Sequence, residues 1–163
     1  MRHVTLLFLL RGKGNNAEVL LAMKKVRFGA GRWNGVGGKL EPGESIHEAL
    51  VRETHEEIGV DLTSAERLGT LDDLYPRTPV LPPVVVRPFV FALTSRPPIV
   101  LNPEVQDAFW VSFRSLAAAG VRGEVTIDHP GIPRRVLPSY TLGKHTIWGM
   151  SERILTPLIT LVS

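Results

Sequence analysis

Apolar runs separated by turn-forming residues recur along the chain, and most of them have the length of a β-strand. Residues 4–10 and 84–93 form the most continuous runs, which is typical of strands buried on both faces. Residues 18–24 follow the first run after a polar turn, so we expect these two strands to pair as a hairpin. Pro88 interrupts the run at 84–93. Because proline cannot donate a ladder hydrogen bond, we expect that strand at a sheet edge or at a bulge.

Two longer segments carry the 3.6-residue period of an amphipathic helix. The first follows Ser45, whose spacing to Glu48 is that of a capping box, and it ends at Gly59. The second spans residues 149–162 and has a continuous apolar stripe. Shorter patterns predict strands at 65–71, 124–127 and 134–137 and a short helix at 113–119. Together the elements predict an α/β fold in which a mixed sheet is sandwiched between helices.

Three carboxylates continue the apolar stripe of the first helix. At about 100° per residue, Glu53, Glu56 and Glu57 fall in the sector that begins at Ile46. Carboxylates so close together repel each other, and an inward position adds a desolvation cost. A hard divalent cation such as Mg²⁺ or Mn²⁺, bound by these carboxylates, offsets both the repulsion and the desolvation cost. Arg52 is placed to hold one carboxylate by a forked hydrogen bond. The alternative is a solvated acidic helix face.

Residues 24–39 form a basic, glycine-rich segment, KKVRFGAGRWNGVGGK. Glycines let the backbone approach a ligand closely, and backbone N–H groups together with Lys or Arg side chains receive phosphate oxygens. The alternative is a basic surface loop without a ligand. We expect Trp33 in the core, because large aromatic side chains are mostly buried.

Residues 38–60, GKLEPGESIHEALVRETHEEIGV, resemble the Nudix box, the signature of Mg²⁺-dependent hydrolases that cut a diphosphate linked to a nucleoside or a similar group. Every fixed polar and glycine position of that motif is present. The one departure is Thr54, where an aliphatic residue is usual, and threonine has the shape of valine. The resemblance implies the Nudix fold.

The resemblance also implies roles for individual residues. The expected ligands of one or more Mg²⁺ ions, with Mn²⁺ as a substitute, are the Gly37 carbonyl and the carboxylates of Glu53, Glu56, Glu57 and Glu104, the last lying six positions before Trp110. Arg52 should orient Glu53. The general base is left open among Glu44, Glu53 and Glu104. The cations expected to neutralise charge on the leaving phosphate are Lys24, Arg27, Arg32 and Lys39.

The substrate prediction rests on two segments that point in different directions. Residues 23–39 resemble the oxidised-purine nucleoside triphosphatases, in which the residue at Asn34 bonds the purine and the residue at Phe28 packs near it. The C-terminal third lacks the tryptophan and paired aspartates that read the base in those enzymes. Its VVVRPFV and IWGM segments resemble coenzyme A diphosphatases, but the Phe-Pro-Gly-Gly entrance expected there is Gly-Val-Gly-Gly in this chain.

We therefore expect hydrolysis of a purine nucleoside triphosphate, ordinary or oxidised, to a monophosphate and pyrophosphate. The first alternative is a diphosphatase of coenzyme A or of another nucleoside diphosphate conjugate. The second alternative, from a different class, is a nucleotide-binding regulator with the same fold and without turnover. The intact arginine and glutamates of the box favour an enzyme.

Composition and charge limit the classes of protein to which this chain can belong. With 163 residues, 44% of them hydrophobic and 21% charged, we expect one globular domain over residues 1–163. The formal charge of +3 suits a polyanionic small substrate and is too weak to indicate nucleic-acid binding. No apolar run approaches the roughly 20 residues of a membrane span, and there is no cysteine for disulfides or thiolate metal sites. We expect a cytoplasmic protein, monomeric or homodimeric.

Overall fold

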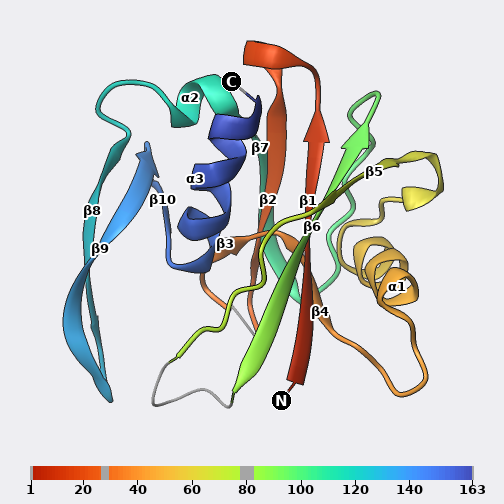
Figure 1. The fold of residues 1–163 in the computed structure, drawn as a ribbon, viewed down its shortest axis with the longest axis horizontal. Helices are drawn as coiled ribbons and strands as arrows, with labels where there is room; N and C mark the ends of the chain where they lie inside the picture. Colours follow the sequence, from red (N-terminus) through yellow and green to blue (C-terminus); the bar gives the residue numbers. More distant parts are fainter. Residues whose placement is uncertain (1, 27–29, 78–82, 163) are drawn as a thin grey trace.

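The computed structural model describes residues 2–26, 30–77 and 83–162. Within them, a mixed sheet of seven strands forms the centre of the molecule, in the order β3-β2-β1-β6-β5, with β4 paired to β1 and β7 paired to β2 (Figure 1). The strands are β1 (Arg2–Arg11), β2 (Glu18–Lys24), β3 (Trp33–Asn34), β4 (Val36–Lys39), β5 (Glu66–Thr70), β6 (Val84–Leu93) and β7 (Val105–Ser112). Short 3₁₀ turns span Gly14–Asn16 and Leu62–Ser64.

Strand β1 lies inside the sheet and is buried on both faces, as its continuous apolar run predicts. Alternate side chains enter two separate cores, since successive residues of a strand point to opposite faces. Leu6 and Phe8 pack with helix α3 (Met150–Val162), whereas Leu7 and Leu9 pack with helix α1 (Ile46–Ile58). The predicted sandwich of a mixed sheet between helices is therefore confirmed.

The predicted hairpin of the first two strands is short. β1 pairs with β2 only at its end, through Leu10 and Arg11, and β4 pairs with the start of β1, from Val4 to Leu7. Residues 33–39, part of the basic, glycine-rich segment, thus contain two strand segments that are buried except at Lys39. Trp33 is 5% exposed and packs edge-on against Phe109 with ring centroids 4.6 Å apart, so its predicted core position is confirmed.

Of the two alternatives predicted for β6, the edge position is wrong, and the irregularity in the β5–β6 pairing falls between Arg67 and Gly69 and not at Pro88. β6 runs between β1, to which it is parallel, and β5, to which it is antiparallel. The carbonyl of Pro88 accepts from the N–H of Leu71, so the nitrogen of Pro88 faces the same side of the strand. β5 has already ended at Thr70 there, and the next pairing is the isolated bridge between Leu74 and Val86. The proline therefore falls between two pairings and removes no bond to β1.

The C-terminal part contains more strand than the sequence pattern indicates. A second, three-stranded antiparallel sheet, counted over the described residues, consists of β8 (Arg122–His129), β9 (Ile132–Leu142) and β10 (His145–Trp148). It lies beside α3, away from α1 (Figure 1). β10 has no counterpart among the predicted strands. The predicted helix at 113–119 is the single turn α2 (Phe113–Leu116).

Both long helices form where the periodicity predicts them. Ser45 caps α1 by accepting from the N–H of Glu48, and Gly59 ends it with the left-handed backbone, φ 72°. α3 runs through Pro157 to Val162. Among the described helices, none has the length and apolar character needed to cross a membrane.

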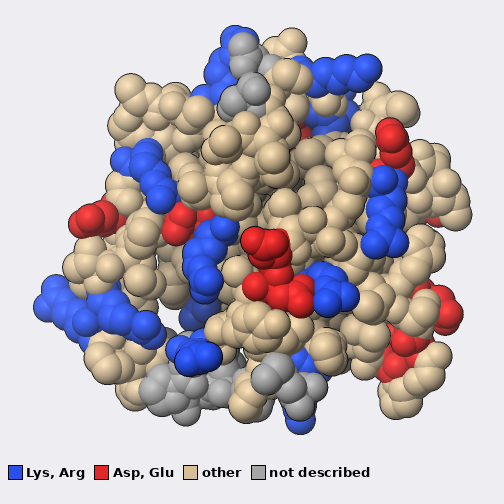
Figure 2. Space-filling model, in the orientation of Figure 1, with Lys and Arg blue, Asp and Glu red and all other residues tan. Residues whose placement is uncertain are grey.

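Charged side chains of both signs are interspersed over the face shown in Figure 2. Lys and Arg side chains gather at the left edge of this view, along the β8–β9 hairpin (Figure 2). Among the exposed residues of β9 are Arg134 and Arg135. The mixture agrees with the small net charge.

Candidate functional site

The glycines of the box entrance let β4 lie tightly against β1. A Cβ on Gly37 would meet the Thr5 carbonyl oxygen at 2.0 Å, and one on Gly35 would meet the Leu7 carbonyl oxygen at 2.6 Å. Real Cβ atoms do not approach oxygen so closely, so any side chain at these two positions would push the strands apart. The glycines thereby fix where the Gly37 carbonyl lies.

Gly38 serves a different purpose, because its missing side chain leaves room for a carboxylate from α1. A Cβ on Gly38 would lie 2.9 Å from Oε1 of Glu53. α1 packs over β4, and its Leu50 shares a core with Val36 of β4. The helix therefore brings its second half, with the predicted metal ligands, directly over the glycine strand.

The predicted residues meet in one pocket of about 620 Å³ between β4, α1 and the loop before β7. Its lining contains seven of the predicted site residues, namely Lys24, Lys39, Arg52, Glu53, Glu56, Glu57 and Glu104, together with Gly38, Leu40, Glu41, Pro42 and Asn102. Acidic and cationic side chains thus share one cavity.

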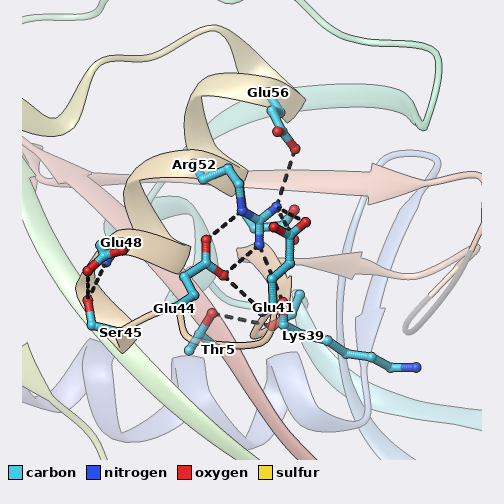
Figure 3. Close-up of polar contacts among 10 residues, drawn as sticks. Thr5, Lys39, Glu41, Glu44, Ser45, Glu48, Arg52 and Glu56 are labelled. Carbon is cyan, nitrogen blue, oxygen red and sulfur yellow. Dashed lines mark hydrogen bonds and ion pairs between the residues drawn. The ribbon is translucent and has the colours of Figure 1, made fainter.

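Arg52 is the centre of an ion-pair network at the outer end of the pocket (Figure 3). Its Nε and Nη2 donate to the two carboxylate oxygens of Glu44 at 2.6 and 2.9 Å. Its Nη1 donates to Glu53 at 3.2 Å and to Glu56 at 3.4 Å, and it lies 3.7 Å from Glu41. The hydrogen bonds from Arg52 lower the pKa of Glu44 to about 2, and Glu44 raises the pKa of Arg52 in return.

Lys24 and Glu57 form a second ion pair at the inner end of the pocket. Lys24 Nζ lies 2.7 Å from Oε1 of Glu57, and it also donates to the Gly37 carbonyl. The Glu57 side chain is 2% exposed. Burial raises the pKa of Glu57 to about 7, Lys24 opposes this shift, and the neighbouring Glu53 carboxylate adds to it. Glu57 therefore needs a positive charge beside it to stay ionised.

The donor set fits a hard divalent cation in kind, although the side chains are not gathered around one point. Within the described part of the chain, no three His, Asp or Glu side chains come close enough together to hold a metal. Glu53 and Glu57 are adjacent, but Glu56 is 56% exposed and directed to Arg52, so the predicted inward position of Glu56 is wrong. A buried carboxylate, a second carboxylate and a carbonyl remain as oxygen ligands of the type that Mg²⁺ prefers.

The two residues predicted at the base, Phe28 and Asn34, and two of the cations predicted at the phosphates, Arg27 and Arg32, lie outside this pocket or outside the described residues. Arg27 and Phe28 belong to the latter group. Asn34 is 8% exposed, and its Oδ1 accepts from the Gly35 N–H at 3.2 Å and from the Ser151 hydroxyl at 2.9 Å. Arg32 is stacked over the Trp148 ring, 4.4 Å from the centroid, and burial lowers its pKa.

Asn102 is a site residue that sequence reasoning missed. Its N–H donates to the Glu57 carbonyl at 3.1 Å, and its Oδ1 accepts from the Glu104 N–H at 3.0 Å. These bonds tie the loop before β7 to the end of α1 and place Glu104 at the pocket. The one available signal was the Asn-Pro pair directly before Glu104, which is typical of a turn.

The glycine strand, the carboxylate helix and the arginine network are the parts of a NUDIX domain, and the chain belongs to that family. The family model, described as NUDIX domain, matches residues 1–130. The resemblance inferred from the box is thus confirmed, and residues 131–163, which contain all of β9, β10 and α3, lie beyond the match.

Two curated relatives illustrate the range of the family. The chain is 49% identical over 54 residues to the oxidized purine nucleoside triphosphate hydrolase of Danio rerio, covering 33% of this chain and 35% of that protein. It is 31% identical over 130 residues to the NAD-capped RNA hydrolase NudC of Pseudomonas putida (strain W619), covering 74% of this chain and 44% of that protein. The chain thus spans less than half the length of either relative.

Solved structures show the same fold at low identity. A MutT/nudix family protein from Enterococcus faecalis superposes with a TM-score of 0.63 at 21% identity, covering 94% of this chain and 59% of that chain. A C. elegans Ap4A hydrolase binary complex superposes with a TM-score of 0.60 at 20% identity, covering 71% and 82%. Since one fold hosts many activities, these likenesses establish the fold alone.

Proposed function

We propose that this chain is a Mg²⁺-dependent pyrophosphohydrolase that cleaves a diphosphate bond in a nucleotide, with a purine nucleoside triphosphate, ordinary or oxidised, as its substrate. One observation carries the proposal: a single pocket combines the carboxylates of Glu53 and Glu57 with the cations Lys24, Lys39 and Arg52. Carboxylates of this kind hold a divalent cation, and the flanking cations attract the phosphate oxygens of a substrate.

The residues that would hold the cation are Glu53, Glu57 and the Gly37 carbonyl, with Glu56 and Glu104 able to reach the pocket from its rim. When bound, the cation neutralises phosphate charge and lowers the pKa of a bound water. Arg52 holds the Glu53 carboxylate over Gly38, which keeps one ligand in place without the metal. Lys39, exposed at the pocket mouth, is placed to receive phosphate oxygens.

The surroundings of Glu44 favour another residue as the general base. Arg52 engages both carboxylate oxygens of Glu44 and lowers its pKa to about 2, so Glu44 is a weak base at neutral pH. Glu44 is better explained as the residue that positions Arg52. We infer that the general base is Glu53 or Glu104, both of which line the pocket.

The second candidate is a diphosphatase of coenzyme A or of another nucleoside diphosphate conjugate. It is favoured by the surroundings of Asn34, whose amide oxygen is already bonded by Gly35 and Ser151 and is not free to read a base. Specificity would then lie with other residues. The regulator without turnover is disfavoured because the ion-pair networks hold the box carboxylates in place.

The test is a hydrolysis screen with Mg²⁺ in which products are separated by ion-exchange chromatography. The substrates are the ordinary and 8-oxo deoxynucleoside triphosphates, coenzyme A, ADP-ribose and dinucleoside polyphosphates. Release of a monophosphate and pyrophosphate from a purine triphosphate is the expected result. Cleavage of a conjugate alone would replace it with the second candidate, and nucleotide binding without turnover would establish the regulator. The Glu57→Gln variant, purified in parallel, measures contaminating hydrolase.

A further inference from the structure

Lys24 occupies the place where the divalent cation would bind. Its ammonium nitrogen lies 2.7 Å from Oε1 of Glu57 and bonds the Gly37 carbonyl, and these oxygens are two of the expected metal ligands. We propose that Lys24 is a tethered cation that fills the metal position in the resting protein and leaves it when the metal binds. The inference rests on the proposed function for the identity of the metal ligands.

Three separate elements create this contact. Lys24 ends β2, Gly37 lies in β4, and Glu57 lies in the last turn of α1. The register between β2 and β7 shifts between Met23 and Lys24, where β7 carries an extra residue. Such a bulge re-aims side chains locally and is common beside functional sites. The Lys24 side chain is 12% exposed and lines the pocket.

The ammonium and the metal exclude each other for geometric and electrostatic reasons. Mg²⁺ binds oxygen at about 2.0–2.1 Å, so a cation bound to Glu57 and to the Gly37 carbonyl fills the space between them. Two positive charges in contact with the same two oxygens repel each other. The long, flexible lysine side chain can swing away, whereas the Gly37 carbonyl is fixed against β1.

The displaced ammonium can move into the pocket that Lys24 already lines. Lys24 lines the pocket that also contains Lys39 and Arg52, so Nζ moves from the buried carboxylate into the cavity where phosphate would bind. Binding of the metal therefore delivers a cation to the substrate. Linkage requires the reverse as well, so a bound diphosphate, which stabilises the displaced lysine, should raise the affinity for the metal.

A competing explanation is that Lys24 only preorganises Gly37 and Glu57 for the metal. The two explanations predict opposite effects for Lys24→Met. If the lysine competes with the metal, its removal tightens Mn²⁺ binding by tenfold or more in the absence of nucleotide. If it preorganises the ligands, removal weakens binding. Lys25→Met is the matched control, because it removes the same charge one residue away from an exposed side chain.

The affinities are measured by isothermal titration calorimetry with Mn²⁺, without nucleotide. Tighter binding by Lys24→Met, with Lys25→Met equal to the parent, supports the proposal. An unchanged or weaker affinity of Lys24→Met overturns it, and so does a gain of the same size in Lys25→Met, which would reflect net charge alone.

A second measurement does not depend on the folding of a variant. The ¹⁵Nζ signal of the Lys24 ammonium should be protected from exchange with water in EDTA, because Glu57 and Gly37 bond it, and saturating Mg²⁺ should abolish that protection. A Lys24 signal that does not respond to Mg²⁺ overturns the proposal. Neither measurement uses turnover. If Mg²⁺ displaces the Lys24 ammonium but the protein hydrolyses none of the substrates, the proposed function is wrong and this inference stands. If the protein hydrolyses a nucleotide but the Lys24 signal does not respond to Mg²⁺, this inference is wrong and the proposed function stands.

Discussion

The two ends of the pocket hold their carboxylates in different ways. Arg52 bonds Glu44, Glu53 and Glu56 with a planar fork, so each contact is one of several and the loss of one leaves the others. Lys24 holds one buried carboxylate, Glu57, with a point charge. The first arrangement is suited to fixing geometry. The second arrangement is suited to the exchange of one cation for another, because a buried carboxylate can pair with either an ammonium or a metal ion.

The comparison also shows how one helix can carry both kinds of carboxylate. Glu53, held by Arg52, and Glu57, held by Lys24, are one turn apart on α1. The Glu57 side chain is 2% exposed, whereas the side chain of Glu56, its neighbour in sequence, is 56% exposed. Burial, more than sequence position, decides which glutamate needs a neighbouring cation to stay ionised. The following predictions test that difference, beginning with the largest expected effect.

Glu57→Gln should lower kcat/KM of the proposed Mg²⁺-dependent reaction by about 1000-fold or more, because it removes the charge of the most buried of the expected metal ligands. This factor corresponds to about 4 kcal/mol of transition-state stabilisation. Steady-state hydrolysis of the substrate found in the screen measures the effect. Glu48→Gln, in the exposed first turn of the same helix, should retain activity. A Glu57→Gln enzyme as fast as the parent would mean that Glu57 does not bind the metal.

The pH dependence of stability should distinguish the buried carboxylate from its neighbours. Burial raises the pKa of Glu57 from 4.5 to about 7, so the folded protein binds this proton more tightly than the unfolded chain does. The contribution of Glu57 to the free energy of unfolding is therefore fully present below about pH 4.5 and is lost as pH rises through 7. The loss amounts to about 3 kcal/mol at most. Denaturant unfolding in EDTA should show this loss in the parent and not in Glu57→Gln. Parallel pH profiles for the two proteins would contradict it.

Arg52→Lys should reduce kcat/KM by about 10–100-fold, the usual cost of losing a residue that orients a metal ligand. Lysine keeps the charge but cannot bond Glu44 with two parallel hydrogen bonds. Arg87→Lys is the matched control, because Arg87 makes the same forked pair with Asp73 away from the carboxylate pocket. Equal losses in both variants would indicate a general effect of removing forked pairs.

Gly38→Ala should reduce activity by about tenfold while leaving the protein folded. The added Cβ meets the end of a flexible side chain, Glu53, which can shift at low cost but then leaves its place in the pocket. Circular dichroism melting and kinetics test the two halves of this statement. Gly123→Ala, where a Cβ meets nothing within 4 Å, controls for the effect of removing a glycine from a strand.

Glu44→Gln should have the smallest effect, a few-fold loss of kcat with an unchanged pH profile. Its pKa of about 2 keeps Glu44 ionised throughout the working range, so its role is to position Arg52. The pH–rate profile of the variant measures this directly. Disappearance of the acidic limb of that profile would instead identify Glu44 as the general base.

The sequence predicted the parts of the site that depend on local chemistry. α1 begins at a cap and ends at a glycine, and both signals lie within a few residues of the helix. The box spacing placed Arg52, Glu53 and Glu57 on one element, and the fold brought them together with Lys24 and Glu104.

Most of the missed features depend on contacts between distant segments. Pro88 fits inside the sheet because β5 ends beside it, which no local pattern reveals. The bond from Ser151 to Asn34 joins residues 117 positions apart. The outward direction of Glu56 is the exception, because it accompanies a bond to Arg52 only four positions away on the same helix.

The central position of β1 has a consequence for the order of folding. β1 pairs with β6 over ten residue pairs that begin with Arg2 and Val84, a long-range parallel contact of the type that forms slowly. The cap of α1 can form early, but Gly37 reaches its place only when β4 docks on β1. The unfolded chain therefore contains no preformed site, and a divalent cation would bind the native state alone. Such binding shifts the folding equilibrium toward the assembled protein, in proportion to the logarithm of the free metal concentration once this exceeds Kd.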